Sequence, residues 1–323
     1  MSYPRDFRAR ACAHSKCIVS VICTAFFLCC ALLCACGKQT ANTQMTAEEQ
    51  AAYLDSRLDS VEMPAVGDNP ILKTEDISVE CTNSADGYLT VLCPEIEDHK
   101  FKLQIQKEDK IYYYDLKQSE EPLVFPLQMG SGKYQIKILS HVENDRYAIV
   151  SGAEIDVSLT DEFKPFIFPN EYVNYTRRSE AVKKALLLSK DSQNDFDTVN
   201  AIFDFIVKNI SYDTDKAQKV TDGMLGGYLP DIDETLSTQK GICFDYASLF
   251  SSMLRSNGIP AKLVTGYAEP GHVYHAWTMI YINDIGWIGK EIRFDGKSWT
   301  LVDATFAASE SDSGIKYFPV NEY

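Results

Sequence analysis

The spacing of apolar residues changes near residue 160, and that change limits the folds that this chain can adopt. Before this point, apolar and polar residues alternate, as in the segment that contains Phe101, Leu103 and Ile105. Polar and glycine-containing turns separate several such segments. This pattern is typical of antiparallel strands, so residues 71–160 are expected to form a small β-sandwich-like accessory domain.

Beyond residue 160 the apolar residues recur at helical spacing. Residues 179–190 and 197–210 each have one apolar face, and Asp197 stands where a helix cap is expected. Strand patterns follow these helices. Helices followed by strands predict an α+β domain over residues 161–323.

Composition and charge argue against a wholly disordered chain and against a protein that binds nucleic acid. Hydrophobic residues make up 45% of the 323 residues and charged residues 24%, which is the balance of a chain that folds around a core. The formal net charge is −15, from 31 basic and 46 acidic side chains. An acidic surface repels phosphate groups, so no nucleic-acid partner is expected.

The N-terminal segment has the pattern of a bacterial secretion signal. Basic side chains precede an uncharged apolar run over residues 18–35. The following L-C-A-C-G resembles a lipobox, although Cys34 stands where a small residue is usual. The resemblance implies a signal peptide over residues 1–35 and an extracytoplasmic lipoprotein, anchored in the cell membrane by a lipid on Cys36. An uncleaved membrane helix and ordinary cleavage are the alternatives, and both also place the protein outside the cytoplasm.

Residues 36–70 are expected to form a polar tether and a short helix, because Thr46 and Glu49 have the spacing of a capping box. Further along, Cys81 and Cys93 flank a predicted hairpin and fall roughly opposite each other. A disulfide between them and two separate buried thiols are equally consistent with the sequence.

Cys243 is predicted to begin a helix. Cys243, Ala247, Phe250 and Leu254 follow one another at helical spacing, and the pattern ends at a glycine and a proline. At a helix N-terminus the macrodipole and the free N–H groups favour the thiolate over the thiol, and the same groups can bind an oxyanion. A buried structural cysteine is the alternative interpretation.

A cysteine nucleophile requires a base, and the base requires a group that orients it. Downstream of Cys243, His275 lies in a predicted strand, and Asp303 lies near the end of another predicted strand, residues 299–305. Cysteine on a helix, histidine on a strand and aspartate on a following strand is an order that lets the three side chains converge. The sequence therefore predicts a thiolate–imidazole–carboxylate relay.

These segments resemble the transglutaminase-like superfamily, which shares its core layout with papain-like cysteine peptidases. The matching motifs are G-I-C-F-D-Y-A around Cys243, G-I-P-A-K-L-V-T-G-Y after its helix, H-A-W from His275, W-T-L-V-D-A-T around Asp303, and I-S-Y-D upstream. They cover residues from about 165 to 323. The resemblance implies that Cys243, His275 and Asp303 are the catalytic residues of a cysteine enzyme that needs no cofactor.

The sequence departs from the family in the segment that joins His275 to Asp303. Two turn signals flank residues 287–294, where the family often has a short hairpin. These residues are expected to extend the hairpin tip; a third strand between the two would break the relay. No side chain is assigned as the oxyanion donor, and Gln239 is left out of the site. No metal site is expected, because His272 and His275 would point to opposite sides of a strand.

Three functions fit this relay. The enzyme could crosslink or deamidate protein glutamine, or it could hydrolyse peptide or amide bonds, because both reactions pass through the same thioester. We expect a peptidase or amidase ahead of an acyltransferase, with a protein or peptide as substrate. The third function is a catalytically inert binding module on the cell surface.

Overall fold

The computed structural model describes residues 45–96, 100–269, 271–282, 286–288, 303–308 and 315–323. Contacts divide the chain into two units, Met1–Glu48 and Glu49–Tyr323. The predicted signal peptide and Cys36 lie outside the described residues. Helix α2 (Ala47–Leu58) begins directly after Thr46, as the capping-box spacing predicts. Within the described ranges, no helix combines the length and the apolar character needed to cross a membrane.

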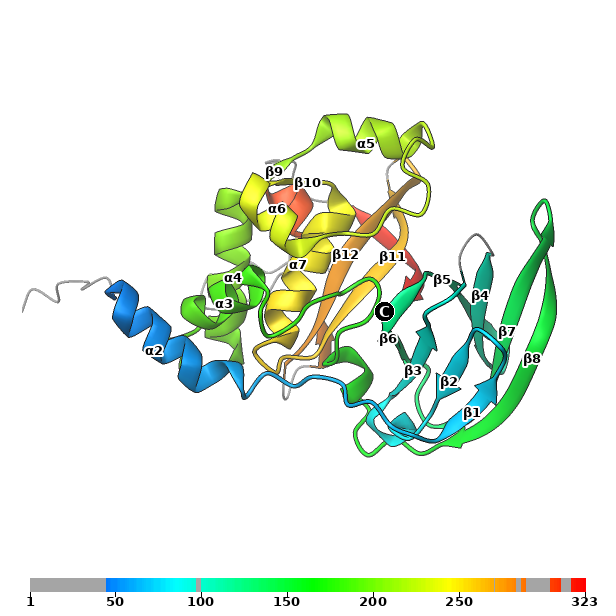
Figure 1. Cartoon of the computed structure of the whole chain (residues 1–323). Coiled ribbons are helices and arrows are strands. Elements are labelled where there is room, and N and C mark those ends of the chain that lie inside the picture. The colour runs from blue at the N-terminus through cyan, green and yellow to red at the C-terminus, as the bar shows by residue number, and fades with distance from the viewer. Residues whose placement is uncertain (1–44, 97–99, 270, 283–285, 289–302, 309–314) are drawn as a thin grey trace, which may run out of the picture. The chain divides into compact units, whose positions relative to one another are not determined.

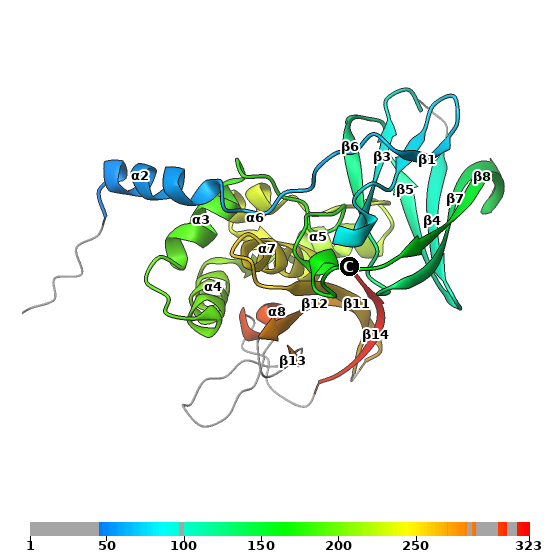
Figure 2. The same cartoon turned by 90° about the horizontal axis from the view of Figure 1, so that it is seen from below.

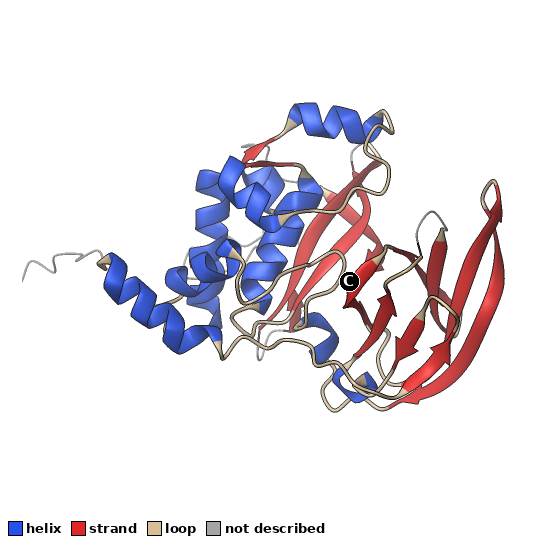
Figure 3. Cartoon of the chain, viewed as in Figure 1, coloured by secondary structure: helices blue, strands red, loops and turns tan. Residues whose placement is uncertain are grey.

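The segment with alternating residues forms two antiparallel four-stranded sheets (Figures 1 and 3). Alternate residues of a strand face the core. Tyr134, Ile136 and Ile138 are fully buried, whereas the residues between them are partly exposed. The first sheet has the order β1-β2-β3-β6, with bounds Pro70–Lys73, Ser78–Glu80, Tyr88–Cys93 and Ser119–Pro126. The second has the order β5-β4-β7-β8, with bounds Lys110–Leu116, Phe101–Lys107, Gly132–Glu143 and Arg146–Val157.

The turn between β2 and β3 requires a glycine. Ser84–Asp86 forms one turn of 3-10 helix, and Gly87 ends it with a φ of +85°. A Cβ atom at this position would lie 2.5 Å from Cγ of Pro165. Both the backbone conformation and the close neighbour exclude a larger residue, which explains the glycine in the predicted hairpin signal.

The disulfide considered for Cys81 and Cys93 is absent from the structure. Both are free thiols, and Sγ of the buried Cys93 lies 3.0 Å from the carbonyl oxygen of Lys117. Glu80 pairs with Thr90, and continuing this register separates the two cysteines by about four strand positions, or about 13 Å. A disulfide needs Cα atoms within about 7 Å of each other. The cysteines are therefore not opposite each other, and two separate thiols are the observed arrangement.

The remaining elements form a mixed α+β fold, in which helices pack against one antiparallel sheet of order β13-β12-β11-β14 (Figure 2). The strands are β11 (Ala261–Glu269), β12 (Val273–Ile282), β13 (Gly286–Ile288) and β14 (Lys316–Glu322). A short parallel pair joins β9 (Ser211–Tyr212) to β10 (Lys240–Gly241). The helices are α3 (Glu180–Leu188), α4 (Asp195–Asn209), α5 (Thr214–Thr221), α6 (Ile232–Thr238), α7 (Cys243–Arg255) and α8 (Ala304–Ala308), with a 3-10 turn at Lys164–Phe166.

The two helices with predicted apolar faces, α3 and α4, form within a few residues of their expected ends. The cap of α4 differs from the prediction. Asn194, not Asp197, is the N-cap, and its side-chain oxygen accepts a hydrogen bond from the Asp197 backbone N–H at 2.9 Å. The helix therefore starts two residues before the expected cap, at Asp195.

Helix α7 lies at the centre of this part of the protein. Every residue from Asp245 to Arg255 is buried, because α3, α4 and α6 and the strands β11 and β12 all contact the helix. Hydroxyl groups join helix and sheet: Thr278 on β12 donates to the carbonyl of Ala247 at 3.3 Å and lies 3.2 Å from the Ser251 hydroxyl. These contacts fix α7 relative to the strand that carries His275.

Arg255 holds the C-terminal end of α7. It is 1% exposed, and its guanidinium donates to the carbonyl oxygens of Ala261, Phe168 and Tyr323 at 2.7 to 2.8 Å. Burial lowers its pKa to about 10, so it remains charged at neutral pH. Three backbone segments that are distant in sequence thus converge on one side chain.

Candidate active site

Cys243 is the first residue of α7, as the helical spacing predicts. The preceding residue, Ile242, has extended backbone angles of φ −93° and ψ 176°, and its N–H donates to the Asp245 carboxylate at 2.7 Å. Asp245 therefore fixes the turn from which α7 starts. Cys243 is only partly buried, in contrast to the residues from Asp245 onward. Its sulfur is thus placed at the accessible, positive end of the helix dipole.

His275 lies on β12 and is 6% exposed. Its Nε2 atom lies 2.8 Å from Oδ2 of Asp303, although 28 residues separate the two. Since an ionised carboxylate only accepts hydrogen bonds, Nε2 is the donor. The Cys243 side chain is close enough to the imidazole to raise its pKa. The structure therefore brings together all three side chains of the predicted relay around one buried ring.

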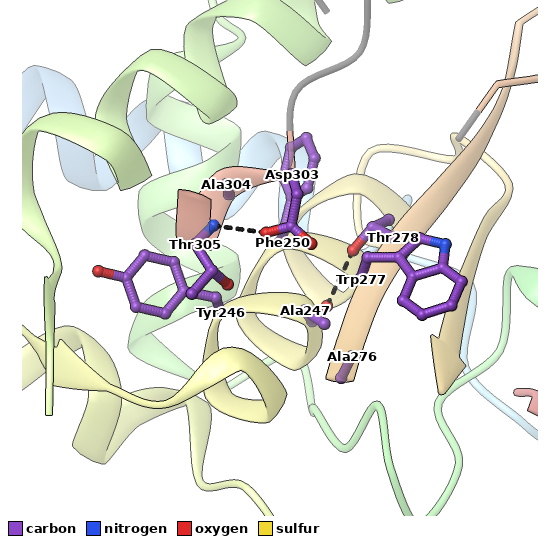
Figure 4. Close-up of a pocket in the computed structure, with 9 residues that line it drawn as sticks. All are labelled: Tyr246, Ala247, Phe250, Ala276, Trp277, Thr278, Asp303, Ala304 and Thr305. Carbon is purple, nitrogen blue, oxygen red and sulfur yellow. Dashed lines mark hydrogen bonds between the residues drawn. The ribbon is translucent and has the colours of Figure 1, made fainter. Parts of the chain in front are cut away.

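Asp303 is held by the backbone that follows it. Its Oδ1 atom accepts a hydrogen bond from the Thr305 N–H at 2.8 Å, and the residue caps the short helix α8 (Figure 4). The predicted strand over residues 299–305 is therefore corrected at its end, because Ala304 and Thr305 are helical. Residues 299–302 lie outside the described part of the chain.

The environment of His275 favours its charged form. Burial alone would lower the pKa, but the hydrogen bond to Asp303 and the interaction with the Cys243 side chain, together with the negative charges of both groups, outweigh it and raise the pKa of His275 to about 10. At neutral pH the ring is then an imidazolium. Trp277 and Tyr317 lie beside it, with ring centroids 6.3 Å from the imidazole, and Phe306 lies at 4.8 Å.

The segment between His275 and Asp303 leaves this contact intact. Strand β13 pairs with β12 through Ile280, Tyr281 and Ile282, which are the last residues of β12. His275 instead pairs with Gly266 on β11. The described part of the segment therefore continues the far end of the hairpin, and no strand among the described residues lies between His275 and Asp303. Residues 289–294 of the expected hairpin tip lie outside the described residues.

A buried network next to Cys243 is the main feature that sequence reasoning missed. Asp245 is 0% exposed, and it accepts hydrogen bonds from the Tyr228 hydroxyl and, at 3.3 Å, from Nζ of Lys216. Lys216 also donates to Tyr228 at 3.0 Å. Burial and the Asp245 charge raise the pKa of Tyr228. The network ties the glycine-rich loop between α5 and α6 to the first turn of α7. Only the buried position of Asp245 on α7 could have suggested it.

Tyr212 is a second residue near the nucleophile that the analysis of the sequence did not assign. It lies on β9, within the I-S-Y-D motif, and its side chain is exposed. Partial desolvation by its surroundings and the charges of Cys243 and Asp245 raise the pKa of Tyr212. Gln239 ends α6 in a left-handed conformation, and its carbonyl accepts from the Ser211 N–H at 2.9 Å.

The interior behind the Asp303 carboxylate is filled. The cavity there, shown in Figure 4, has a volume of about 10 Å³, which is at the lower limit for a single water molecule. Its lining includes Trp277, Thr278 and Asp303. A substrate must therefore approach Cys243 from its exposed side and not through the core.

The described residues contain no group of three metal-binding side chains. His272 precedes β12 in a turn with a φ of +51°. Its Nδ1 lies 3.0 Å from Glu269, and its ring stacks on Tyr267 with centroids 4.2 Å apart. His272 is therefore engaged away from His275.

The sequence was compared with family models and with known proteins, and one family model matches part of this chain. The family model described as the transglutaminase-like superfamily matches residues 184–304. The uncharacterized protein YebA of Bacillus subtilis is 28% identical over 150 residues, which are 40% of this chain and 19% of YebA. The Kyphoscoliosis peptidase of Mus musculus is 28% identical over 141 residues, 41% of this chain and 19% of that peptidase. The matches thus span about a fifth of each relative.

Among solved structures, the periplasmic domain of TgpA from Pseudomonas aeruginosa is similar to this chain. The TM-score is 0.32 at 13% identity, and the alignment covers 74% of this chain and 96% of that domain.

Proposed function

We propose that this chain, whose residues 184–304 form a domain of the transglutaminase-like superfamily, is a cysteine enzyme that acts on protein or peptide amide bonds outside the cytoplasm. The observation that carries the proposal is the buried imidazole of His275, which is hydrogen-bonded to Asp303 at 2.8 Å and whose pKa is raised by both Asp303 and Cys243. A thiolate beside an imidazolium is an activated nucleophile with its proton donor already in place.

In the proposed first step, the Cys243 sulfur attacks the carbonyl carbon of an amide. The carbonyl oxygen becomes an oxyanion, and the free N–H groups at the start of α7 can stabilise it. The imidazolium of His275 gives its proton to the amide nitrogen, the C–N bond breaks, and an amine or ammonia leaves. A thioester on Cys243 remains, and His275 is neutral.

In the second step, neutral His275 removes a proton from the incoming nucleophile. Water releases a carboxylic acid, which is the outcome of a peptidase, amidase or deamidase. A substrate amine forms a new amide, which is the outcome of a crosslinking enzyme. Asp303 keeps the imidazole oriented in both steps and stabilises its charge.

We place hydrolysis ahead of crosslinking. One of the similar proteins is named a peptidase, and the partly exposed Cys243 leaves water free to reach the thioester. The lipobox-like L-C-A-C-G supports a position on the outer side of the cell membrane, with a lipid on Cys36. The substrate there would be a protein or peptide.

Trapping the acyl-enzyme tests the proposal. The full chain is mixed with a library of unlabelled peptides, quenched in acid and analysed by mass spectrometry, with and without an added primary amine. We expect a peptide adduct on Cys243 that Cys243→Ala abolishes and the matched control Cys81→Ala keeps. The peptide products identify hydrolysis, deamidation or amine transfer. Absence of any adduct, with Cys243 unmodified, would leave the inert binding module as the better interpretation.

A further inference from the structure

The proposed reaction leaves a cation near the start of α7 without a role. Lys216 lies in the first turn of α5, its side chain is 17% exposed, and its Nζ atom lies 3.3 Å from Oδ2 of Asp245. Asp245 follows Cys243 by two residues on α7, and its side chain is fully buried. A carboxylate at this depth acts on neighbouring groups with little screening by water.

The local sequence holds Lys216 in this position. Asp213 caps α5, and its Oδ1 atom accepts a hydrogen bond from the Lys216 N–H at 2.9 Å. The Asp213 N–H donates to the carbonyl of Gly241, also at 2.9 Å. Gly241 precedes Cys243 by two residues, so the first turn of α5 is fixed to the segment that leads into α7.

Gly241 allows the Asp245 carboxylate to reach the start of its own helix. A Cβ atom at Gly241 would lie 2.6 Å from Cβ of Asp245, which is closer than such atoms approach in proteins. With glycine there, the carboxylate accepts hydrogen bonds from the Ile242 N–H at 2.7 Å and from the Tyr228 hydroxyl. The Tyr228 hydroxyl in turn accepts from Lys216 at 3.0 Å. Lys216 thus binds the carboxylate both directly and through Tyr228.

The negative charge of Asp245 acts close to the Cys243 sulfur. Desolvation and the charges of Cys243 and Asp245 raise the pKa of Tyr212 on β9, so both charges lie near one hydroxyl group. An uncompensated carboxylate in this place would oppose the thiolate, because each of two like charges disfavours the other. It would also offset the positive end of the α7 dipole.

The other ionisable groups around the nucleophile are either compensated or neutral. The Asp303 carboxylate is bound to the His275 ring at 2.8 Å, and this ring is the cation beside the thiolate. Tyr212 on β9 and Tyr228 in the loop before α6 are uncharged at neutral pH, because the pKa of each hydroxyl is raised. Among these groups, Asp245 is the one whose charge another residue has to balance.

We propose that Lys216 is a positioning residue of the active site, which cancels the Asp245 charge beside Cys243 and holds this carboxylate on the Ile242 N–H, so that the thiolate forms at the start of α7. The helix dipole and the imidazolium of His275 are then free to stabilise the sulfur. Lys216 acts through Asp245 and transfers no proton. The inference rests on the proposed function only in naming Cys243 as the nucleophile.

The pH profile of alkylation measures the thiolate without any substrate. The full chain is treated with iodoacetamide over a series of acidic to alkaline buffers, and modification of the Cys243 peptide is quantified by mass spectrometry. We expect Lys216→Met to move the profile toward higher pH by about one unit, because the Asp245 charge is then uncompensated. The matched control is Lys219→Met, which removes an exposed charge from the same helix and should move the profile by less than about 0.3 unit.

A second substitution separates the effect of charge from an effect on the fold. Asp245→Asn removes the negative charge and keeps an oxygen that accepts from the Ile242 N–H. Adding it to Lys216→Met should return the profile to within about 0.3 unit of that of the unmodified protein. A merely structural role of Lys216 predicts no such recovery. The buried thiol of Cys93 reports folding in the same samples, because it reacts only when the protein opens.

The proposal is overturned if Lys216→Met leaves the profile unchanged while Cys93 stays protected, if Lys219→Met shifts it equally, or if the folded double variant does not restore it. Where Lys216→Met unfolds the protein, Asp245→Asn alone decides. Its profile should stay in place or move to lower pH, because the Lys216 cation is then unbalanced; a move to higher pH overturns the proposal. A profile that responds to Lys216 in a protein that forms no peptide adduct would sink the proposed reaction and leave this inference standing.

Discussion

The Nε2 atom of His275 lies 2.8 Å from the Asp303 carboxylate, and the two residues are buried to 6% exposure each. A buried carboxylate that keeps its charge needs a positive or strongly donating partner, and the imidazole provides it. Because Nε2 faces Asp303, Nδ1 is the ring nitrogen left for Cys243. The pair thus sets both the protonation and the orientation of the proposed base.

We expect the His275 ring to titrate near 10, and not near its ordinary 6.5. The two negative neighbours stabilise the imidazolium, so the stability from this pairing is complete below about 6.5 and is lost as the pH rises through about 10. Asp303→Asn and Cys243→Ala should each move the titration toward 6.5. NMR of ring-labelled histidine measures it, with His272→Gln as the control that leaves it unchanged. A titration near 6.5 in the unmodified protein would contradict the paired geometry.

Lys216 is expected to stabilise the start of α7 through Asp245. Lys216→Met leaves a fully buried carboxylate without its cation and should lower the free energy of unfolding by about 3 kcal/mol. Urea denaturation measures this loss. The matched control is Lys208→Met, which removes an exposed ion pair to Asp204 at 2.8 Å and should cost less than about 1 kcal/mol. Equal losses in the two variants would show that the buried network is not important for stability.

The three described cysteines should react as separate thiols. Iodoacetamide is expected to modify Cys243 first in the native protein, whereas burial raises the pKa of Cys81 and Cys93 and slows their reaction. Denaturation without reductant should then expose both for alkylation. Intact-mass spectrometry before and after reduction checks this. If the two cysteines are alkylated only after reduction, the disulfide between Cys81 and Cys93 is present after all.

Glu171 should make the protein less stable as the pH rises. Its folded pKa of about 7 lies above the ordinary 4.5, so the carboxyl group has no effect on stability below 4.5, lowers the stability increasingly between 4.5 and about 7, and has a constant unfavourable effect above 7. Glu171→Gln should therefore be stabilising at about pH 8 and close to neutral at about pH 4. Urea denaturation at both values measures the difference, and Glu121→Gln should show no such trend. A stabilisation that is independent of pH would mean that the carboxyl group does not titrate in this range.

The lipid proposal depends on which cysteine follows the lipobox-like motif. Labelling of the expressed chain with radioactive palmitate should vanish in Cys36→Ser and persist in Cys34→Ser. The second variant is the control, because it changes a cysteine in the same motif. The reverse pattern would assign the modification to Cys34, and labelling of neither would favour an uncleaved helix or ordinary cleavage.

The sequence by itself determined the secondary structure around two of the three candidate catalytic residues. Apolar spacing showed that Cys243 begins a helix and that His275 lies in a strand, because helix and strand periods are local properties of neighbouring residues. The order of the motifs along the chain indicated the family, and this required no knowledge of the distances between the motifs in space.

Only the tertiary structure decided which distant groups meet. Whether His275 reaches Asp303 across 28 residues could not be read from their separation, since closing a longer loop costs little extra free energy. The same limit applied to Lys216 with Asp245, and to the strand register that keeps Cys81 from Cys93. The burial of Nδ2 of Asn170 and Oε2 of Glu171 without hydrogen-bond partners likewise depends on tertiary packing. Contacts of this kind depend on how whole elements pack, which local residue patterns do not encode.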